Sequence, residues 1–268
     1  MKDLAQRSYG RRFVVGVALL ALAGCCRRPA QAESPAPRRS AGVVAAATAP
    51  PAASVALLPR PQSDPVEAQA ERLAAQAAAA ERSVTPLVVE LAAKLGGSTH
   101  KLKFRLKTKA SILRKLRLRL AQNSTLKLSD VVIDDTLRFT LRIDDEPAGH
   151  HVGAIKQALA ALAVKGHHVA QLKNYWPADD NYSGVNCVLR APGGLLWELQ
   201  FHTTASLAAA ATTRAWYEEL RCADTPLPRK QQLFDEMTRE WNKVSIPQGI
   251  LEPGALHPHE EIRDRPRP

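Results

Sequence analysis

The clearest pattern of hydrophobic and polar positions in this chain is a strict alternation over residues 197–202, within the longer run 195–203. Trp197, Leu199 and Phe201 are apolar, and the residues between them are polar. Successive side chains of an extended strand point to opposite faces of a sheet, so the alternation predicts a half-buried strand. A solvated sheet face gives the same pattern, but an acid beside an amide and an imidazole also suits a metal and phosphate site. The polar side chains of this face are Glu198, Gln200 and His202.

In other stretches of the chain the apolar residues recur at the spacing of a strand or of a helix. Alternating or β-branched runs predict further strands over 138–143, 168–175 and 184–190, and Pro192-Gly193-Gly194 predicts a hairpin turn before the strand described above. Apolar residues at helical spacing predict helices over 66–80, 86–95, 111–120, 151–164, 206–222 and 230–244. Together these elements predict an α+β fold, a small mixed β-sheet flanked by helices.

The first 65 residues predict export rather than a packed core. A basic start is followed by the short apolar run 13–23 and then by Leu22-Ala23-Gly24-Cys25, which resembles a lipobox. We therefore expect an exported lipoprotein held at the membrane by a lipid on Cys25 and facing the periplasm; plain secretion is the alternative. The expected organisation is a leader over 1–25, a disordered Pro/Ala-rich linker over 26–65, one domain over 66–250 and a disordered tail over 251–268.

Cysteines and histidines give little sign of a structural metal site. Cys187 and Cys222 are far apart in the sequence, and their spacing leaves a disulfide and two free thiols equally open. The pairs His150-His151 and His167-His168 are adjacent in sequence and are not spaced as in a zinc finger, so we expect surface or loop histidines.

Positive charge is concentrated in one part of the chain. The formal net charge is +11, and basic and apolar residues alternate over 101–109. Such a patch attracts polyanions, whether nucleic acid, an anionic lipid surface or nucleotide phosphates. Phe104 is the only aromatic residue in this run. Because nucleic-acid grooves use stacking aromatics, we favour a phosphate pocket, with a solvated basic face as the alternative.

Four sequence elements resemble the synthetase domain of RelA/SpoT-type alarmone synthetases. Arg105-Leu106-Lys107, Ser111-Ile112 and Lys115 reproduce its Arg-x-Lys-x-x-x-Ser-Ile-x-x-Lys pattern. Tyr182-Ser183-Gly184-Val185-Asn186 is similar to its Gly-Tyr-Arg-Ser-x-His element, and residues 198–203 are similar to its Glu-Ile-Gln-Ile-Arg-Thr strand. Asp134-Asp135 followed by Arg138 resembles its aspartate strand. The elements occur in the family's order.

The resemblance implies a nucleotidyltransferase-like fold that moves pyrophosphate from ATP to a ribose hydroxyl of a nucleotide or tRNA acceptor. It implies that Glu198 and either Asp134 or Asp135 hold Mg²⁺, with Gln200 beside them, and that Tyr182 and Asn186 bind the acceptor. The residues implied for the phosphates of ATP are Arg105, Lys107, Ser111, Lys115, Arg138 and His202. Such transfer needs mainly positioning and charge neutralisation.

The choice between the two aspartates depends on the strand. In a regular strand Asp134 shares the face of Thr136 and Arg138, which predicts that Asp134 is the exposed aspartate; a bulge would reverse this prediction. Asn186 and His202 depart from the family's His and Arg, which indicates a different acceptor or lost activity. Two classes of function follow: an enzyme, as an exported toxin or effector with an immunity or delivery partner, or a non-catalytic lipoprotein that binds an anionic ligand through its basic patch.

Overall fold

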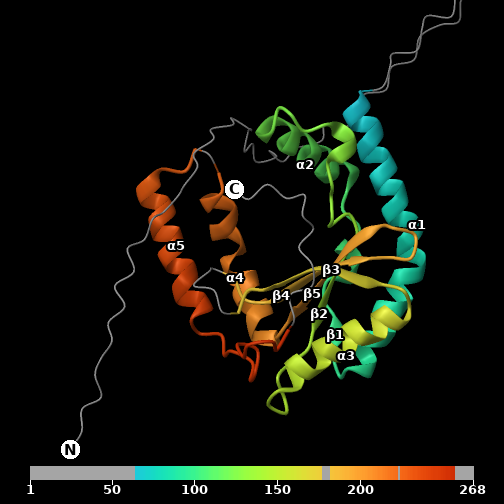
Figure 1. The fold of residues 1–268 in the computed structure, drawn as a ribbon. Helices are drawn as coiled ribbons and strands as arrows, with labels where there is room; N and C mark the ends of the chain where they lie inside the picture. Colours follow the sequence, from blue (N-terminus) through green and yellow to red (C-terminus); the bar gives the residue numbers. More distant parts are fainter. Residues whose placement is uncertain (1–63, 177–181, 223, 257–268) are drawn as a thin grey trace, which may run out of the picture.

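Five strands form one mixed sheet at the centre of the computed structural model, which describes residues 64–176, 182–222 and 224–256 (Figure 1). The strand order is β1-β2-β5-β4-β3; β2 and β5 are parallel, and the other neighbours are antiparallel. This arrangement confirms the predicted α+β class. The strands are β1 (Ser98–Thr99), β2 (Arg138–Arg142), β3 (His168–Asn174), β4 (Val185–Arg190) and β5 (Leu196–His202). The two residues of β1 were too few to give a sequence pattern.

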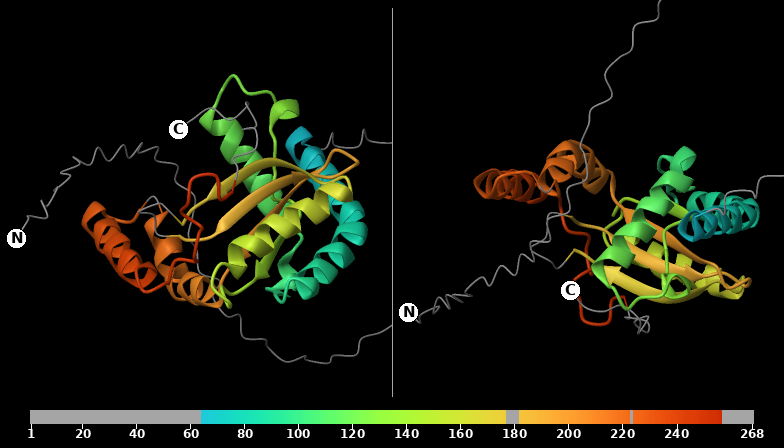
Figure 2. Two further views of the ribbon diagram at one scale, coloured as in Figure 1. Left: turned by 60° about the horizontal axis from the view of Figure 1, so that its bottom comes forward. Right: turned by 90° about the horizontal axis from the view of Figure 1, so that it is seen from above.

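The two faces of the sheet differ in character. Helices α1 (Pro65–Lys94) and α3 (His150–Val164) cover one face and share the main hydrophobic cluster with it (Figure 2). Trp197 and Phe139 lie on this face with their rings edge to face at 5.7 Å, and both are buried. Burial of such a side chain stabilises the fold by about 1.5–3 kcal/mol. The opposite face carries the polar side chains of β2, β4 and β5, as the alternation predicted.

Helix α1 is continuous where the sequence predicted two helices, over 66–80 and 86–95. Pro86 lies inside the helix, where it removes one backbone hydrogen bond at a cost of about 3 kcal/mol. Val84 and Val88, on either side of it, are buried at 1% and 0% exposure against the sheet. The burial of these two side chains offsets the lost hydrogen bond. Packing of this helix face on the sheet therefore outweighs the tendency of proline to end a helix.

Helix α2 (Lys109–Gln122) packs against the first half of α1 and forms a second hydrophobic cluster with it. Thr108 is the N-cap, and its hydroxyl oxygen accepts from the backbone N–H of Ser111. The short helices η1 (Leu102–Phe104) and η2 (Leu128–Asp130) flank α2 in the chain. Lys115 of α2 reaches Asp135, which lies just before β2.

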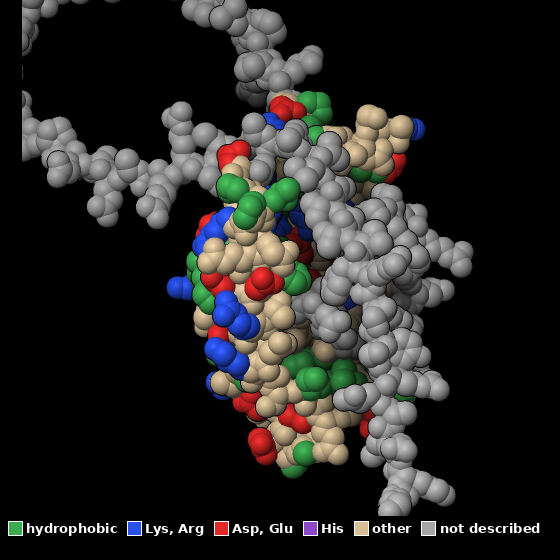
Figure 3. Space-filling model, turned by 90° about the vertical axis from the view of Figure 1, so that its left-hand side faces the viewer, with side chains coloured by type: hydrophobic (Ala, Val, Ile, Leu, Met, Phe, Trp, Pro, Cys, Tyr) green, Lys and Arg blue, Asp and Glu red, His purple; other side chains and the backbone are tan. Residues whose placement is uncertain are grey.

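Helices α4 (Thr204–Leu220) and α5 (Leu227–Trp241) form a hairpin that follows β5. Leu233, Met237 and Trp241 are buried at a spacing of four residues, which is typical of an amphipathic helix. On the outer side, acidic and basic side chains are intermixed (Figure 3). None of the helices in the described part of the chain is long and apolar enough to cross a membrane.

Several smaller predictions change in the structure. His151 and His167, predicted to lie in loops or on the surface, are buried at 0% and 7% exposure, because the first faces the core from α3 and the second packs on Trp197. Cys187 and Cys222 are both free thiols. Ala255, inside the predicted tail, is buried at 8% exposure. The predicted leader, Cys25 and all of the linker except its last two residues lie outside the described residues.

Candidate active site

The polar face of β5 lies between two strands that add further polar groups. Glu198 is in register with Arg138 on the parallel strand β2, and Gln200 is in register with Thr140 on β2 and Asn186 on β4. The Thr140 hydroxyl donates to Oε1 of Gln200 over 3.0 Å. Gln200 in turn lies beside Glu198 and opposes the rise in the pKa of that carboxyl, a link through Thr140 that the sequence did not reveal.

The segment 105–107 runs beside the start of β2 and brings its cations to the aspartates. The backbone N–H of Lys107 donates to the carbonyl of Thr136 over 2.9 Å, and Leu106 forms an isolated bridge with Leu137. The Lys107 ammonium consequently lies 2.9 Å from Oδ2 of Asp135. The predicted lysine and aspartate therefore do meet.

Asp135 binds two ammonium groups at once. Lys115 of α2 reaches Oδ1 of Asp135 at 2.8 Å, in addition to the contact with Lys107, and lies 3.6 Å from Asp134. Burial by itself would raise the pKa of Asp135, but the hydrogen bonds and charges of Lys115 and Lys107 outweigh it and lower that pKa. Asp135 is therefore ionised and fully engaged in this state.

The prediction that Asp134 is the exposed aspartate is wrong. Regular strand geometry begins only at Arg138, and both aspartates lie in a turn before it, so the parity of a strand does not apply to them. The side chain of Asp134 is 10% exposed and that of Asp135 is 16% exposed. Asp135 lines a cavity, which makes it the better placed of the two as a ligand.

Arg105 is held by an acid from α1. Its Nε donates to Oε1 of Glu81 over 2.6 Å, and the Thr85 hydroxyl donates to the same oxygen over 2.7 Å. The pKa of Glu81 is lowered by these two hydrogen bonds. Both side chains of the ion pair are mostly covered, at 29% and 16% exposure. Glu81 and Thr85 thus position a predicted phosphate ligand, and sequence reasoning did not find them.

Glu198 is a carboxylate in a low-dielectric position. Burial raises its pKa, the Arg138 guanidinium opposes that rise, and the negative charges of Asp135 and Asp134 add to it. Arg138 Nε lies 4.0 Å from Oε2 of Glu198. The three carboxylates are thus close enough to repel one another, which is the arrangement expected where a cation would be shared.

The donor set is compatible with Mg²⁺. Within the described residues there is no group of three or more His, Cys, Asp or Glu side chains that could hold a metal ion. Magnesium, however, uses one or two carboxylates and fills its other positions with substrate phosphates and water. Asp135 and Glu198 supply that sparse oxygen set, so the residues present fit the ion.

Tyr182 and His202 form a buried hydrogen-bonded pair on the same face. The Tyr182 hydroxyl donates to Oδ1 of Asn186 over 2.8 Å and lies 2.9 Å from Nε2 of His202, whose Nδ1 is 3.0 Å from the Ser206 hydroxyl. Both ring nitrogens of His202 therefore lie within hydrogen-bond distance of a hydroxyl group. Burial lowers the pKa of His202 to about 4.

His202 is consequently neutral and is engaged at both nitrogens, although it contributes to a cavity wall. Its predicted role as a phosphate ligand is not favoured by this placement. The Tyr182 ring makes edge contacts with Tyr175, His202 and Trp241. The ring thereby forms a wall between the sheet and the α4–α5 hairpin.

Two adjoining cavities are lined by most of the predicted residues, although not by Glu198, Asp134 or Lys115. The first, of about 550 Å³, is basic and is lined by Arg105, Lys107, Ser111, Asp135 and Arg138 among others. The second, of about 520 Å³, is aromatic and polar and is lined by Arg138, Tyr182, Asn186, Gln200 and His202 among others. Both cavities share His100, Lys101, Arg138, Thr140 and Arg214.

Several wall residues of these cavities were not predicted. Lys101 belongs to the basic run, but nothing in its spacing distinguished it. Arg214 reaches the site from the middle of α4, a placement for which the sequence carries no local sign. The unpredicted wall residues most relevant to ligand binding are His100, Lys101, Thr140, Tyr175, Arg214 and Trp241.

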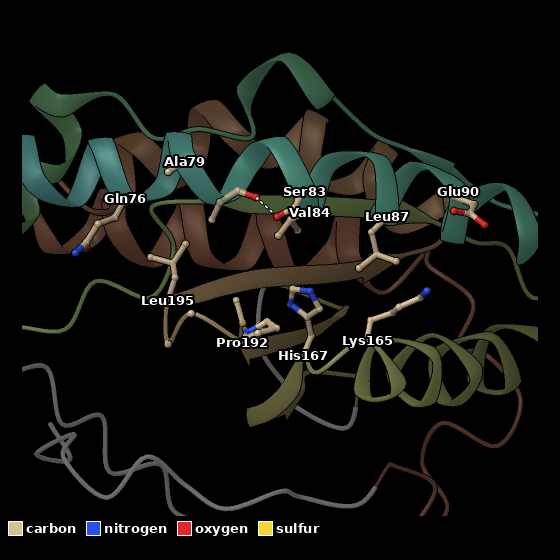
Figure 4. Close-up of a pocket in the computed structure, with 14 residues that line it drawn as sticks. Gln76, Ala79, Ser83, Val84, Leu87, Glu90, Lys165, His167, Pro192 and Leu195 are labelled. Carbon is tan, nitrogen blue, oxygen red and sulfur yellow. Dashed lines mark hydrogen bonds between the residues drawn. The ribbon is translucent and has the colours of Figure 1, made fainter.

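A third cavity, of about 930 Å³, lies elsewhere, between α1 and the turn that joins β4 to β5 (Figure 4). Its wall is mostly apolar, with His167 and Lys165 beneath α1. Trp197 Nε1 donates to Nδ1 of His167 over 3.2 Å. None of the predicted site residues lines this cavity, which is separate from the polar face of the sheet.

Comparisons with known proteins give only structural likenesses. No protein family and no curated protein sequence matches this chain. A chain in the crystal structure of the complex between the Type VI effector Tas1 and its immunity protein is 20% identical, with 64% of this chain and 94% of that chain covered and a TM-score of 0.44. The small alarmone synthetase 1 from Bacillus subtilis bound to its product pppGpp is 16% identical, with 66% and 93% covered and a TM-score of 0.45.

The small alarmone synthetase 2 from Bacillus subtilis is 13% identical, with 65% of this chain and 90% of that chain covered and a TM-score of 0.46. Likenesses of this size carry no argument about chemistry. The function of this chain must therefore be argued from its own residues.

Proposed function

We propose that this protein is a magnesium-dependent transferase that moves pyrophosphate from ATP to a ribose hydroxyl of a nucleotide or RNA acceptor. The observation that carries the proposal is the meeting of Glu198, Asp135, Lys107 and Arg138 at one edge of the parallel pair β2–β5, beside two adjoining cavities. A transfer from one nucleotide to another needs space for both, and the two adjoining cavities are here called the basic lobe and the aromatic lobe of the site. The basic lobe suits the phosphates of the donor, and the aromatic lobe suits the base of the acceptor.

In this reaction the acceptor hydroxyl attacks the β-phosphorus of ATP, the bond from that phosphorus to the bridging oxygen breaks, and AMP leaves. The hydroxyl proton passes to a carboxylate oxygen of Glu198. Gln200 holds that carboxylate in place. When bound by Asp135 and Glu198, Mg²⁺ supplies neutralisation of the phosphate charge.

The direct test incubates the full chain with Mg²⁺ and ATP labelled at the γ-phosphate, with guanine nucleotides, adenine nucleotides and tRNA as acceptors. Label should move to one acceptor, and Glu198→Gln should reduce that transfer by at least about 100-fold, the scale of a lost general base. Glu90→Gln is the matched control, because Glu90 is an exposed acid of α1 that pairs with Lys94. Equal transfer by the Glu198→Gln and Glu90→Gln variants would refute the role of Glu198.

A second candidate is a non-catalytic module that binds an anionic ligand. One observation favours it: the predicted phosphate ligands Arg105, Lys107 and Lys115 already have carboxylate partners, whereas Lys101, Arg138 and Arg214 line both cavities and could bind an anion without any catalytic step. No label transfer to any acceptor by a folded wild-type chain would favour this candidate over the enzyme.

We further propose that the protein is exported through its leader, held at the membrane by a lipid on Cys25, and used as a toxin or effector with an immunity or delivery partner. The sequence of residues 1–25 supports this proposal. Labelling of the wild-type chain with a radioactive fatty acid, and loss of that label in Cys25→Ser, would test the anchor. Retention of the label in the variant would exclude it.

A further inference from the structure

The cations around the two cavities of the candidate active site fall into two groups. Arg105, Lys107 and Lys115 are neutralised by Glu81 and Asp135. Lys101 and Arg214 form no ion pair within residues 64–176, 182–222 and 224–256, and Arg138 only approaches Glu198 at 4.0 Å. Of the cations that remain available to a ligand, the sequence therefore predicted only Arg138.

The available cations stand at the junction of the cavities. Lys101 precedes η1, Arg138 begins β2, and Arg214 lies in the middle of α4, yet all three line both cavities. Two acids also line these walls. Asp135 is engaged by two lysines, and Glu218 lies 3.9 Å from Arg221. The junction therefore has an excess of positive charge that the protein itself does not balance.

The backbone at Lys101 supports a role for its side chain. Lys101 has a φ of 50°, and it is the one non-glycine residue with positive φ among the described residues. Its carbonyl accepts from the N–H of Phe104 over 2.9 Å and so starts η1. Glycine adopts this conformation at lower cost, so the turn by itself does not call for a lysine. Such strain is commonly found at functional sites.

We infer that Lys101, Arg138 and Arg214 form an anion clamp that holds a polyphosphate chain where it passes from the basic cavity to the aromatic one. The clamp adds Lys101 and Arg214 to the predicted ligands. The assignment of the polyphosphate to a nucleotide rests on the proposed function. Arg138 and Arg214 offer planar forks for phosphate oxygens, and Lys101 offers a point charge.

The clamp is tested with inorganic tripolyphosphate, which is a negatively charged polyphosphate without the base or ribose of a nucleotide. Binding to the full-length protein is measured by isothermal titration calorimetry without Mg²⁺. Arg214→Ala and Lys101→Ala should each weaken binding by about tenfold, the effect of one lost charge-assisted contact. The matched controls are Arg239→Ala on the exposed side of α5 and Lys103→Ala in η1, neither of which lines any of the three cavities described above. Both controls should stay within about twofold of the wild type.

Two results would overturn the clamp: failure of the wild type to bind tripolyphosphate, or equal binding by the clamp and control variants. Lys101→Gly keeps the inference testable if Lys101→Ala unfolds, because glycine accepts the backbone conformation while removing the charge. The clamp and the proposed function fail separately. If the clamp variants weaken tripolyphosphate binding but the wild type transfers no label, only the proposed enzyme activity is refuted. If the wild type transfers label and both clamp variants bind tripolyphosphate and transfer label as well as the wild type does, only the clamp is refuted.

Discussion

The protonation of His202 offers a quantitative test of how the polar face is built. His202 is 3% exposed, and its ring lies between the Tyr182 hydroxyl and the Ser206 hydroxyl. A second proton on the ring would turn its one acceptor nitrogen into a donor. It would also place a positive charge in a buried site. Burial, and to a smaller extent His151 and His100, lower the pKa of His202 to about 4 from the ordinary 6.5.

The folded state therefore binds fewer protons at His202 than the unfolded state does, and the free energy of unfolding falls as the pH drops through 6.5 toward 4. Linkage between these two pKa values gives a loss of about 2 kcal/mol from pH 7 to pH 5 and of about 3 kcal/mol by pH 4. Above pH 7 the contribution is constant. His151, whose pKa is also lowered by burial, adds to the loss in the same direction.

The assay is urea unfolding at pH 7, 6, 5 and 4, with the wild type compared with His202→Gln. The Gln side chain offers one donor group and one acceptor group, as a neutral imidazole does, but it does not titrate. The contribution of His151 is common to both proteins. We expect the variant to be less stable at pH 7 and to lose about 2 kcal/mol less than the wild type between pH 7 and pH 5. Parallel stability curves for the two proteins would refute the reasoning.

Two further predictions concern contacts that hold the site. Gly184→Ala should destabilise the fold by about 1–3 kcal/mol, because a Cβ there would lie 2.8 Å from Cε1 of His202; thermal unfolding measures the change. Glu81→Gln should cost about 1–3 kcal/mol, because it leaves the mostly covered Arg105 guanidinium without its acid; urea unfolding at pH 7 measures it.

Each of these variants has a matched control. Gly153→Ala places its Cβ in open space within helix α3 and should not destabilise the fold, since alanine is the better helix former. Glu90→Gln removes an exposed i,i+4 pair with Lys94 and should change stability by less than about 0.5 kcal/mol. A loss at Gly184 or Glu81 no larger than that of its control would contradict the corresponding contact.

The sequence predicted the part of the site that follows a regular period. Glu198, Gln200 and Arg138 belong to strands, so the alternation of side chains placed them on the polar face correctly. The aspartates could not be placed in the same way, because Asp134 and Asp135 lie in a turn, where no period relates neighbouring residues. Residues such as Arg214 and Glu81 reach the site from helices whose packing depends on the whole fold.

The continuity of α1 through Pro86 has a mechanical consequence. A helix of 30 residues is a rod of about 45 Å, and its far end is packed on the sheet. Its first turns are tied to α2, through Asp64 to Arg117 at 2.9 Å and through Glu71 to Lys109 at 2.5 Å. Tension applied to the chain ahead of Asp64 would be shared between α1 and α2. Because Lys115 of α2 binds Asp135, this tension would be transmitted from α2 to an acid of the candidate active site.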